Sequence, residues 1–239
     1  MDDNQYSRCT DFLSRLSADD QKALCRIGTQ RAYAKDELVF SVGCNSEDIY
    51  IIVDGRVKIF ELSEEGKEVI LWFCFPGELF GVAEALGHQH CGVREVNALA
   101  CSDAQILTIK HYDFVRFLKT HPDTALTVIE LLSYRLRELG DVLLNLASND
   151  VTSRVIKLLT RLGTRYGKTF GQGLYLDIPL THQEMADMIG TSRQTVTTVL
   201  GSLKRMGKLR VEQRTIYIQD GAWVKSIMGE MPVVSCATG

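Results

Sequence analysis

The residues whose types and spacing could do chemistry lie between positions 180 and 208, and the chemistry they could do is to read the edges of nucleic-acid bases. Apolar residues recur at helical spacing in two short runs on either side of Gly190. Thr181 followed by Glu184 predicts a capping box at the start of the first helix, and Ser192 is a suitable N-cap for the second. Two helices of about two and three turns joined by a glycine turn form a helix-turn-helix.

The second of these helices carries polar side chains on the face that its apolar residues leave exposed. Arg193 and Gln194 stand at its start, where Arg can form two hydrogen bonds with guanine and Gln two with adenine in the major groove. An ordinary helical hairpin with a solvated polar face would satisfy part of the same pattern. We predict contacts to DNA from Thr181, Thr191, Ser192, Arg193, Gln194, Thr195, Thr197, Thr198, Ser202 and Lys204.

The charges are divided unevenly along the 239 residues of the chain. Residues 1–149 carry 15 Lys and Arg against 23 Asp and Glu, whereas residues 150–239 carry 12 against 7. The net charge of −3 is therefore the sum of a charge of −8 on the N-terminal part and a charge of +5 on the C-terminal part, which contains the helix pair. This asymmetry favours a two-part regulator whose basic part meets the phosphates of DNA.

Composition excludes several other classes of protein. A content of 45% hydrophobic and 24% charged residues is typical of a globular chain. No apolar run approaches the ~20 residues of a membrane span, and the acidic N-terminus does not resemble a signal peptide. The seven cysteines lack the spacing of a disulfide framework, which favours a reducing compartment. We expect a cytoplasmic protein without a membrane partner.

The elements that precede the helix pair alternate between helical and extended patterns. Helices are expected over 10–30 and 111–118, with many short strands between Arg31 and Ile109. Asp54-Gly55 predicts a hairpin between the two strands that flank it, and residues 64–67 predict another. Strands of this length and spacing are typical of an antiparallel barrel or jelly roll.

A long helix predicted from Pro122 to about Ala147 carries an apolar seam more than about 20 Å long. The helix could pack this seam on its own barrel, but a seam of this length is more typical of pairing with a second copy. We therefore predict a parallel homodimer through Ile129, Leu132, Leu136, Leu139, Leu143 and Leu146.

Beyond the long helix, residues 148–150 predict a hinge-like break and residues 151–166 another amphipathic helix. Strands are expected over 174–178 and 210–218, the latter as a wing-type hairpin after the second helix of the pair. We expect an α+β fold in three parts: an N-terminal antiparallel β-barrel over 1–120, the long dimerisation helix and hinge over 121–149, and a C-terminal winged helix-turn-helix over 150–239.

Five segments in this order resemble the cyclic-AMP receptor protein and FNR (CRP/FNR) family of bacterial transcription regulators. They are VDGRVKIF at 53–60, PGELFG at 76–81, HPDTALTVIELLSYRL at 121–136, NDVTSRV at 149–155 and TSRQTVTTVLGSLKRMG at 191–207. The resemblance extends from about Cys9 to Ile218, and it is strongest to the cyclic-AMP receptor and carbon-monoxide-sensing (CooA) branches.

The resemblance implies a cyclic-nucleotide-binding-like jelly roll and no catalytic activity. It implies a homodimer that binds a palindromic operator in double-stranded DNA, with RNA polymerase as a further partner and an allosteric effector in the barrel. The base-reading arginine of the family falls on Arg193, its usual glutamate on Gln194 and its second arginine on Thr198. Because threonine cannot make the same guanine contact, the half-site preference should differ from that of the cyclic-AMP receptor protein.

The resemblance places the effector near Gly77, Glu78, Leu79, Phe80, Gly81, Val82, Arg94, Glu95, Leu136, Leu139 and Gly140. The family's ribose-binding glutamate falls on Val82, its phosphate-binding Arg-Ser pair on Arg94-Glu95, and its adenine-binding Thr-Ser pair on Leu139-Gly140. We therefore do not expect cyclic AMP as the effector. Arg94 could hold a different anion, or it could simply pair with Glu95 or another neighbour.

Two other chemistries are compatible with part of the sequence, and two more are not. His88, His90 and Cys91 are weak candidates for a haem or metal site, although a solvated polar loop is the favoured explanation. Cysteines in or near the barrel could form a redox pair, or serve as small apolar residues. Cys9 and Cys25 are too isolated to hold an iron–sulphur cluster. A cupin-type metal enzyme would need histidines on strands, which His88, His90 and His111 do not provide.

Overall fold

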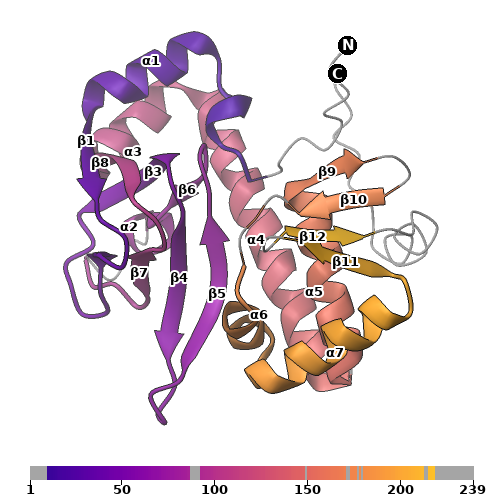
Figure 1. The fold of residues 1–239 in the computed structure, drawn as a ribbon. Helices are drawn as coiled ribbons and strands as arrows, with labels where there is room; N and C mark the ends of the chain where they lie inside the picture. The colour runs from indigo at the N-terminus through magenta and orange to yellow at the C-terminus, as the bar shows by residue number, and fades with distance from the viewer. Residues whose placement is uncertain are drawn as a thin grey trace. The chain divides into compact units, whose positions relative to one another are not determined.

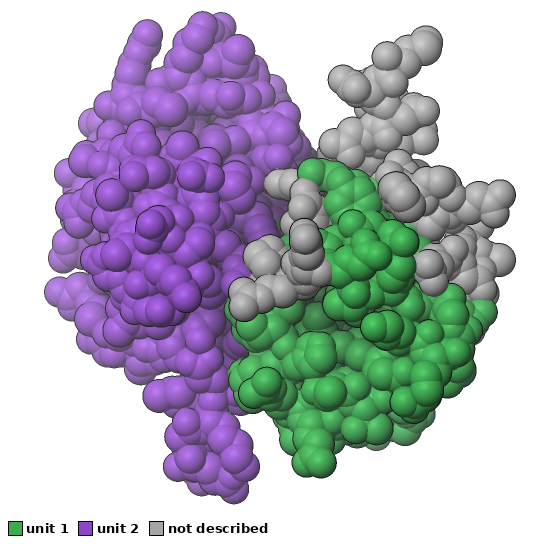
Figure 2. Space-filling view, in the orientation of Figure 1, with its two compact units in different colours: residues 1–8, 141–239 green, residues 9–140 purple. Residues whose placement is uncertain are grey.

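The computed structural model describes residues 10–86, 92–148, 150–170, 173–176, 178, 180–212 and 215–218. Two compact units make up the chain, one of residues 9–140 and one that includes residues 141–239 (Figure 2). The weak metal candidates His88, His90 and Cys91 lie outside the described residues, as does Asn149 of the predicted hinge.

The first unit contains two four-stranded antiparallel sheets (Figure 1). The predicted antiparallel jelly roll is confirmed, although its sheets remain separate and do not close into a barrel. One sheet has the order β1 (Gly28–Tyr33), β8 (Ala104–Lys110), β3 (Asp48–Asp54) and β6 (Leu79–Phe80). The other has the order β2 (Leu38–Phe40), β7 (Asn97–Ala100), β4 (Val57–Leu62) and β5 (Glu68–Cys74).

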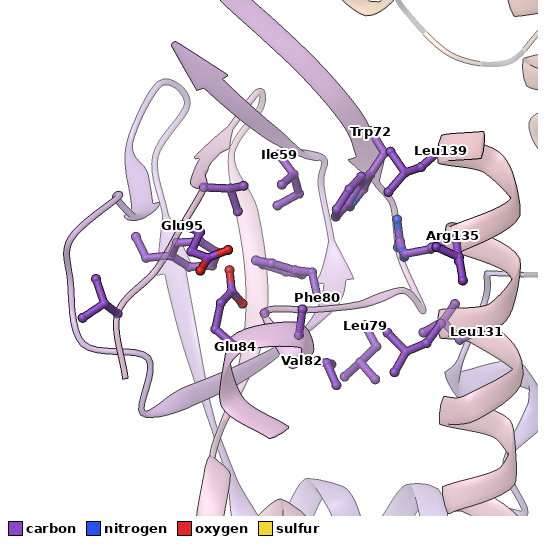
Figure 3. A pocket seen from close by; sticks show the side chains of 17 residues that line it. Ile59, Trp72, Leu79, Phe80, Val82, Glu84, Glu95, Leu131, Arg135 and Leu139 are labelled. Atoms are coloured by element: carbon purple, nitrogen blue, oxygen red, sulfur yellow. The ribbon is translucent and has the colours of Figure 1, made fainter. Parts of the chain in front are cut away.

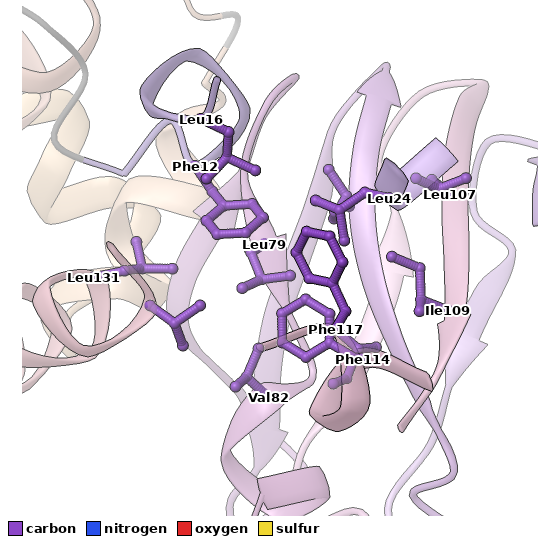
Figure 4. Close-up of a cluster of buried hydrophobic side chains, with 13 residues drawn as sticks. Phe12, Leu16, Leu24, Leu79, Val82, Leu107, Ile109, Phe114, Phe117 and Leu131 are labelled. Atoms are coloured by element: carbon purple, nitrogen blue, oxygen red, sulfur yellow. The ribbon is translucent and has the colours of Figure 1, made fainter. Parts of the chain in front are cut away.

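Strand β3 is buried on both faces and joins two hydrophobic clusters. Ile49 and Ile51 belong to a cluster with residues of the helices, whereas Tyr50 and Ile52 belong to a cluster with residues of both sheets. This division follows from the alternation of side chains along a strand, and it explains why β3 is a continuous apolar run. Figure 4 shows the first cluster, in which Phe12, Leu24, Phe114, Phe117 and Leu131 are brought together from separate helices and loops.

Helices of the first unit are η1 (Leu13–Arg15), α1 (Ala18–Ile27), α2 (Val82–Leu86), α3 (His111–Thr120) and the first part of α4 (Pro122–Ser148), whose residues from Asp141 onward belong to the second unit. The predictions for α3 and α4 are confirmed, whereas the prediction of helix through residue 30 is wrong, because β1 begins at Gly28. Most of β1 is exposed, so it lacks the alternation by which a strand is recognised. It is a strand because residues 28–33 pair with residues 109–104 of β8, far along the chain.

The turn at Asp54-Gly55 does not form the predicted hairpin. β3 and β4 flank this turn but belong to different sheets, since β3 pairs with β8 and β6, and β4 pairs with β5 and β7. The local prediction of a turn is correct, because Gly55 has a φ of 87°. The predicted second hairpin is confirmed, with β4 and β5 paired from Val57↔Cys74 to Leu62↔Glu68.

The second unit combines helices with one antiparallel sheet of order β11-β12-β10-β9. Its wing, the hairpin of β11 (Leu209–Glu212) and β12 (Thr215–Ile218), is confirmed, as is helix α5 (Val151–Tyr166). The strand expected over 174–178 is β10 (Gly173–Leu176), and β9 (Gly167–Phe170), which pairs with it, was not predicted. The remaining helices are α6 (His182–Ile189) and α7 (Arg193–Arg205). Across the described ranges, the molecule has no helix of the length and apolarity needed to traverse a bilayer.

Two glycines with similar backbone conformations allow the importance of the β3–β4 turn to be measured. Gly55 and Gly66 both have positive φ, 87° and 75°. A Cβ at Gly55 would lie 2.7 Å from Cα of Ala104 and closer still to the carbonyl oxygen of Asp103, whereas at Gly66 it would meet no atom within 4 Å. We expect Gly66→Ala to cost about 1–2 kcal/mol of unfolding free energy, from left-handed strain alone. Gly55→Ala should cost about 1–3 kcal/mol more, from the backbone clash.

Urea denaturation of the two variants measures this difference. Equal losses would mean that the backbone near Ala104 moves aside without cost.

Candidate functional site

The predicted helix-turn-helix is present as α6 and α7, and local hydrogen bonds define its ends. The Thr181 hydroxyl accepts from the Glu184 amide at 3.1 Å, while the Glu184 carboxylate accepts from the Thr181 amide at 2.7 Å, so the predicted capping box is confirmed. Gly190 ends α6 in the left-handed conformation, with φ 62° and ψ 53°. Ser192 caps α7 by accepting from the Thr195 amide at 3.1 Å.

The buried faces of both helices fix the turn between them. α6 buries Met185, Ala186, Met188 and Ile189, and α7 buries Val196, Val199, Leu200 and Leu203. Arg154 of α5 donates from Nη1 to the carbonyl oxygen of Ile189 at 2.9 Å, which satisfies an acceptor at the end of α6. The orientation of α7 is therefore set by packing and by hydrogen bonds to backbone groups, and it does not depend on the side chains of Arg193 and Gln194.

The polar side chains of α7 fall into two groups, those that are exposed without an internal partner and those that bond within the fold. Arg193, Gln194 and Lys204 are exposed, and the side chains of Arg193 and Gln194 form no hydrogen bond or ion pair with another described residue. By contrast, Thr197 donates to the carbonyl oxygen of Arg193 at 2.8 Å and lies 2.8 Å from Nδ1 of His182, and Thr198 donates to the carbonyl oxygen of Gln194 at 3.0 Å.

Three further hydroxyls of this surface are also partly occupied. The Thr195 hydroxyl lies 2.7 Å from Oγ of Ser192, and the hydroxyls of Thr181 and Ser192 serve as caps. These groups therefore have internal partners that the sequence alone did not reveal, and Arg193 and Gln194 are the side chains at the start of α7 that are available to an external partner.

The effector region predicted in the first unit contains a pocket of about 610 Å³ between the sheets and α4 (Figure 3). Seven of the predicted effector residues line it: Leu79, Phe80, Gly81, Val82, Glu95, Leu136 and Leu139. The structure does not place Gly77, Glu78, Arg94 or Gly140 among the lining residues. Ten further residues do line it: Phe40, Ile59, Trp72, Ala83, Glu84, Val93, Val96, Leu131, Leu132 and Arg135.

Arg94 makes its polar contacts inside the fold. Its side chain is buried, and its Nη1 donates to the carbonyl oxygen of Gly81 at 2.9 Å and pairs with Glu84 at 3.2 Å. Nη2 donates to the carbonyl oxygen of Asp48, and the guanidinium lies 4.2 Å from the ring centroid of Phe40. The neighbour with which Arg94 pairs is thus Glu84 and not Glu95. Burial raises the pKa of the nearby Tyr50 to about 12, and the positive charge of Arg94 opposes this shift.

Arg135 is the functional candidate that was missed by sequence reasoning. It lines the pocket from α4, with its guanidinium carbon 4.9 Å from the Trp72 ring and Nη2 3.8 Å from Glu78 and 3.7 Å from Sγ of Cys74. A signal for it exists, because Thr124, Val128, Leu131 and Arg135 recur at spacings of four, three and four and are all buried. A charged residue in the buried stripe of a helix marks a polar function or a buried ion pair.

The predicted dimer seam is uncovered in a single copy of the chain. Leu136 is 72% exposed and Leu143 is 68% exposed, and Ile129, Leu132 and Leu146 are also exposed, although Leu139 is only partly so. By the geometry of an α-helix, this seam is centred roughly 90° around α4 from the stripe that packs on the sheets. The stripe and the seam are therefore neighbouring surfaces with different centres, and residues of both line the pocket.

The cysteines and histidines considered as ligands are dispersed. Cys74 is buried, Cys101 is half-buried, and Cys25 and Cys44 are exposed. In the part of the chain that the structure describes, no cluster of three or more His, Cys, Asp or Glu residues is arranged to hold a metal ion.

Two family descriptions match the chain, one in each unit. Residues 30–121 match the cyclic nucleotide-binding domain, and residues 153–224 match the Crp-like helix-turn-helix domain. The first match contains the sheets and most of the pocket lining, and the second contains the capped helix pair and the wing.

Similarity to individual proteins extends over most of the chain. The cyclic AMP receptor protein of Thermus thermophilus is 31% identical over 199 residues, which cover 83% of this chain and 87% of that protein. The CRP-like cAMP-activated global transcriptional regulator of Mycobacterium tuberculosis is 28% identical, over 79% of this chain and 83% of its own length. A mutant CooA from Carboxydothermus hydrogenoformans has a similar structure, with a TM-score of 0.74 and 25% identity over 85% of this chain and 89% of that one.

The cap of α7 generates a test of how its start is held. Replacing Ser192 by alanine leaves the Thr195 amide without its side-chain acceptor and should cost about 1 kcal/mol of unfolding free energy, whereas Ser192→Gly should cost only a few tenths. Thermal unfolding of both variants, followed by circular dichroism, measures the difference. If Ser192→Ala were as stable as the wild type, the hydroxyl would not stabilise the helix.

Proposed function

We propose that this chain, which belongs to the CRP/FNR family of transcription regulators and binds DNA through its helix-turn-helix, acts as a homodimer controlled by an effector in its jelly roll. The observation that supports this proposal most strongly is at the start of α7. There, two exposed side chains, Arg193 and Gln194, have the donors and acceptors that base edges require and have no internal partners among the described residues. We expect the protein to act in the cytoplasm, where its target DNA is, and to contact RNA polymerase.

The internal bonds of the hydroxyls divide the proposed DNA surface by role. Arg193 and Gln194 would read bases, since a guanidinium and an amide each form two hydrogen bonds with a purine edge. Lys204, in the last turn of α7, would contact phosphate. Ser192, Thr195, Thr197 and Thr198 would help chiefly by fixing the helix, because their hydroxyls already bond to it. Thr181, Thr191 and Ser202 would lie at the edge of this surface.

Arg193→Ala should weaken binding to an operator selected from random duplexes by about 1–3 kcal/mol, with a much smaller effect on random DNA. Fluorescence anisotropy at fixed salt measures both affinities. Lys204→Ala is the matched control, and we expect it to weaken binding to both kinds of DNA by the same factor and to reduce the dependence on salt. Equal losses on operator and random DNA for Arg193→Ala would refute base reading by this residue.

The homodimer is proposed from the exposed leucines of α4. A row of uncovered leucines along one side of a long helix is costly in water, and its spacing fits the seam of a coiled coil. A second copy of the same helix offers a matching row, so a twofold arrangement would bury both. Two recognition helices related by such an axis could occupy the two halves of a palindromic operator.

Leu136→Glu should convert the dimer to a monomer and abolish operator binding, because it would place two carboxylates near a twofold axis in an apolar interface. Leu126→Glu is the matched control: Leu126 is also exposed on α4 but lies off the seam, and this variant should remain dimeric. Sedimentation velocity at micromolar concentration distinguishes the two. An intact Leu136→Glu dimer would show that the interface lies elsewhere.

We propose that the pocket beside α4 is the effector site and that its effector is not cyclic AMP. Of the described lining residues, all but Glu84, Glu95, Trp72 and Arg135 lack polar side-chain atoms, so the ribose and adenine of a nucleotide would find few partners. Glu95 also places a negative charge where a phosphate would be expected. A ligand in this pocket would contact both the sheets and α4, and could therefore shift the population of α4 arrangements.

A further inference from the structure

We infer that the effector pocket takes a carboxylic acid with one negative charge and a mainly apolar body, held by Arg135 and Trp72. This inference rests on the proposed function of the pocket as an effector site. It starts from two residues that line the pocket, Arg135 and Trp72, each of which carries a hydrogen-bond donor without an acceptor: Nη1 of Arg135 and Nε1 of Trp72 are both buried without a partner among the described residues.

Unpaired buried donors are uncommon in folded proteins, because each has lost its hydrogen bond to water without gaining another. Here the two lie together, since the guanidinium carbon of Arg135 is 4.9 Å from the ring centroid of Trp72, and Figure 3 shows both side chains at the α4 end of the pocket. A carboxylate supplies two acceptor oxygens and the charge that a guanidinium prefers. Arg94 also has an unpaired nitrogen, Nε, but it is not among the pocket-lining residues.

The rest of the pocket determines the body of the ligand. From Trp72 the lining continues through Ile59, Phe80, Leu79, Val82 and Leu131, all apolar. A space of about 610 Å³ with such walls has the dimensions and character of a site for a drug-sized apolar molecule. The favourable free energy of binding would come mainly from burying an aliphatic chain or an aromatic ring, with the carboxylate fixing its orientation.

The opposite end of the pocket limits the charge of the ligand. Glu84 and Glu95 lie near one another there, beyond Phe80 as seen from Arg135 (Figure 3). Glu84 is balanced by its ion pair with Arg94 at 3.2 Å, whereas Glu95 pairs with no described residue. A second negative charge at this end would be repelled, which disfavours dicarboxylates and phosphate esters and favours a single carboxylate bound at Arg135.

A ligand in this pocket would also contact side chains of the proposed dimer interface. Leu132, Leu136 and Leu139 line the pocket and belong to the proposed dimer seam, so one row of side chains would face both ligand and partner helix. A ligand that packs on these leucines changes the surface offered to the second copy. It therefore has the differential contacts that an allosteric effector requires.

The test compares acids with their uncharged amides on the full-length protein by isothermal titration calorimetry, without DNA. The probes are decanoate, decanamide, 4-phenylbutyrate and 4-phenylbutanamide. We expect at least one acid to bind ten- to a hundredfold more tightly than its amide, the difference produced by one charge-assisted hydrogen bond. Cyclic AMP and succinate should bind more weakly than that acid.

Substitutions then test whether Arg135 and Trp72 cause the preference for acid over amide. Arg135→Gln should abolish the preference for acid over amide and leave the affinity for the amide nearly unchanged, whereas Arg137→Gln, an exposed arginine two residues along α4, should retain the preference. If Arg135→Gln does not fold, because Glu78 loses its partner, Trp72→Phe provides a second test. That variant keeps one aromatic ring but removes the N–H donor together with the second ring of the indole, and it should reduce the preference for acid over amide severalfold.

Several results would overturn the inference. They are equal binding of acid and amide, a preference that survives Arg135→Gln, tighter binding of cyclic AMP or succinate than of either acid, and no binding of any probe. Operator binding is measured separately by anisotropy. If the wild-type protein binds operator but shows no preference for acid over amide, this inference alone is refuted. If the wild-type protein does not bind operator, the proposed function is refuted.

Discussion

The packing of one stripe of α4 on the jelly roll is the constraint on which the rest of the first unit depends. Thr124, Val128, Leu131 and Arg135 are buried along this stripe, and their spacing fixes the rotation of the helix about its axis. That rotation directs Arg135 into the pocket and leaves the leucine seam uncovered. A helix rotated by one residue, about 100°, would exchange these surfaces and lose both the pocket wall and the seam.

Buried charge in this unit is organised around two arginines with different environments. Arg94 has a carboxylate, two carbonyl oxygens and an aromatic ring around it, so it stabilises the loop that carries Gly81. Arg135 has longer contacts and an unpaired nitrogen beside the pocket. Since a buried guanidinium without a full set of acceptors is costly, the difference points to Arg135 as the group that a ligand would complete.

In the second unit, short-range interactions hold the proposed DNA-reading surface in place. The capping box, the left-handed Gly190 and the Ser192 cap each link residues no more than three or four apart, and together they set the start of α7. The buried faces of α6 and α7 then hold this turn against the remaining core. As a result, the side chains proposed to read DNA can stay fully exposed, because none of them is needed to keep the helix in place.

The sequence by itself determined the features whose causes lie within a few residues: the caps of α6 and α7, the extents of α3, α4 and α5, the turn at Gly55 and the wing. These follow from backbone hydrogen bonds and side-chain periodicity along one segment. Only the tertiary structure decided that β3 and β4 belong to different sheets, that β1 is a strand, that Glu84 is the partner of Arg94, and that Arg135 and Trp72 meet beside the pocket. Each of these depends on groups brought together from 10 to about 80 positions apart, and the pairing of such groups is selected by the packing of the whole unit.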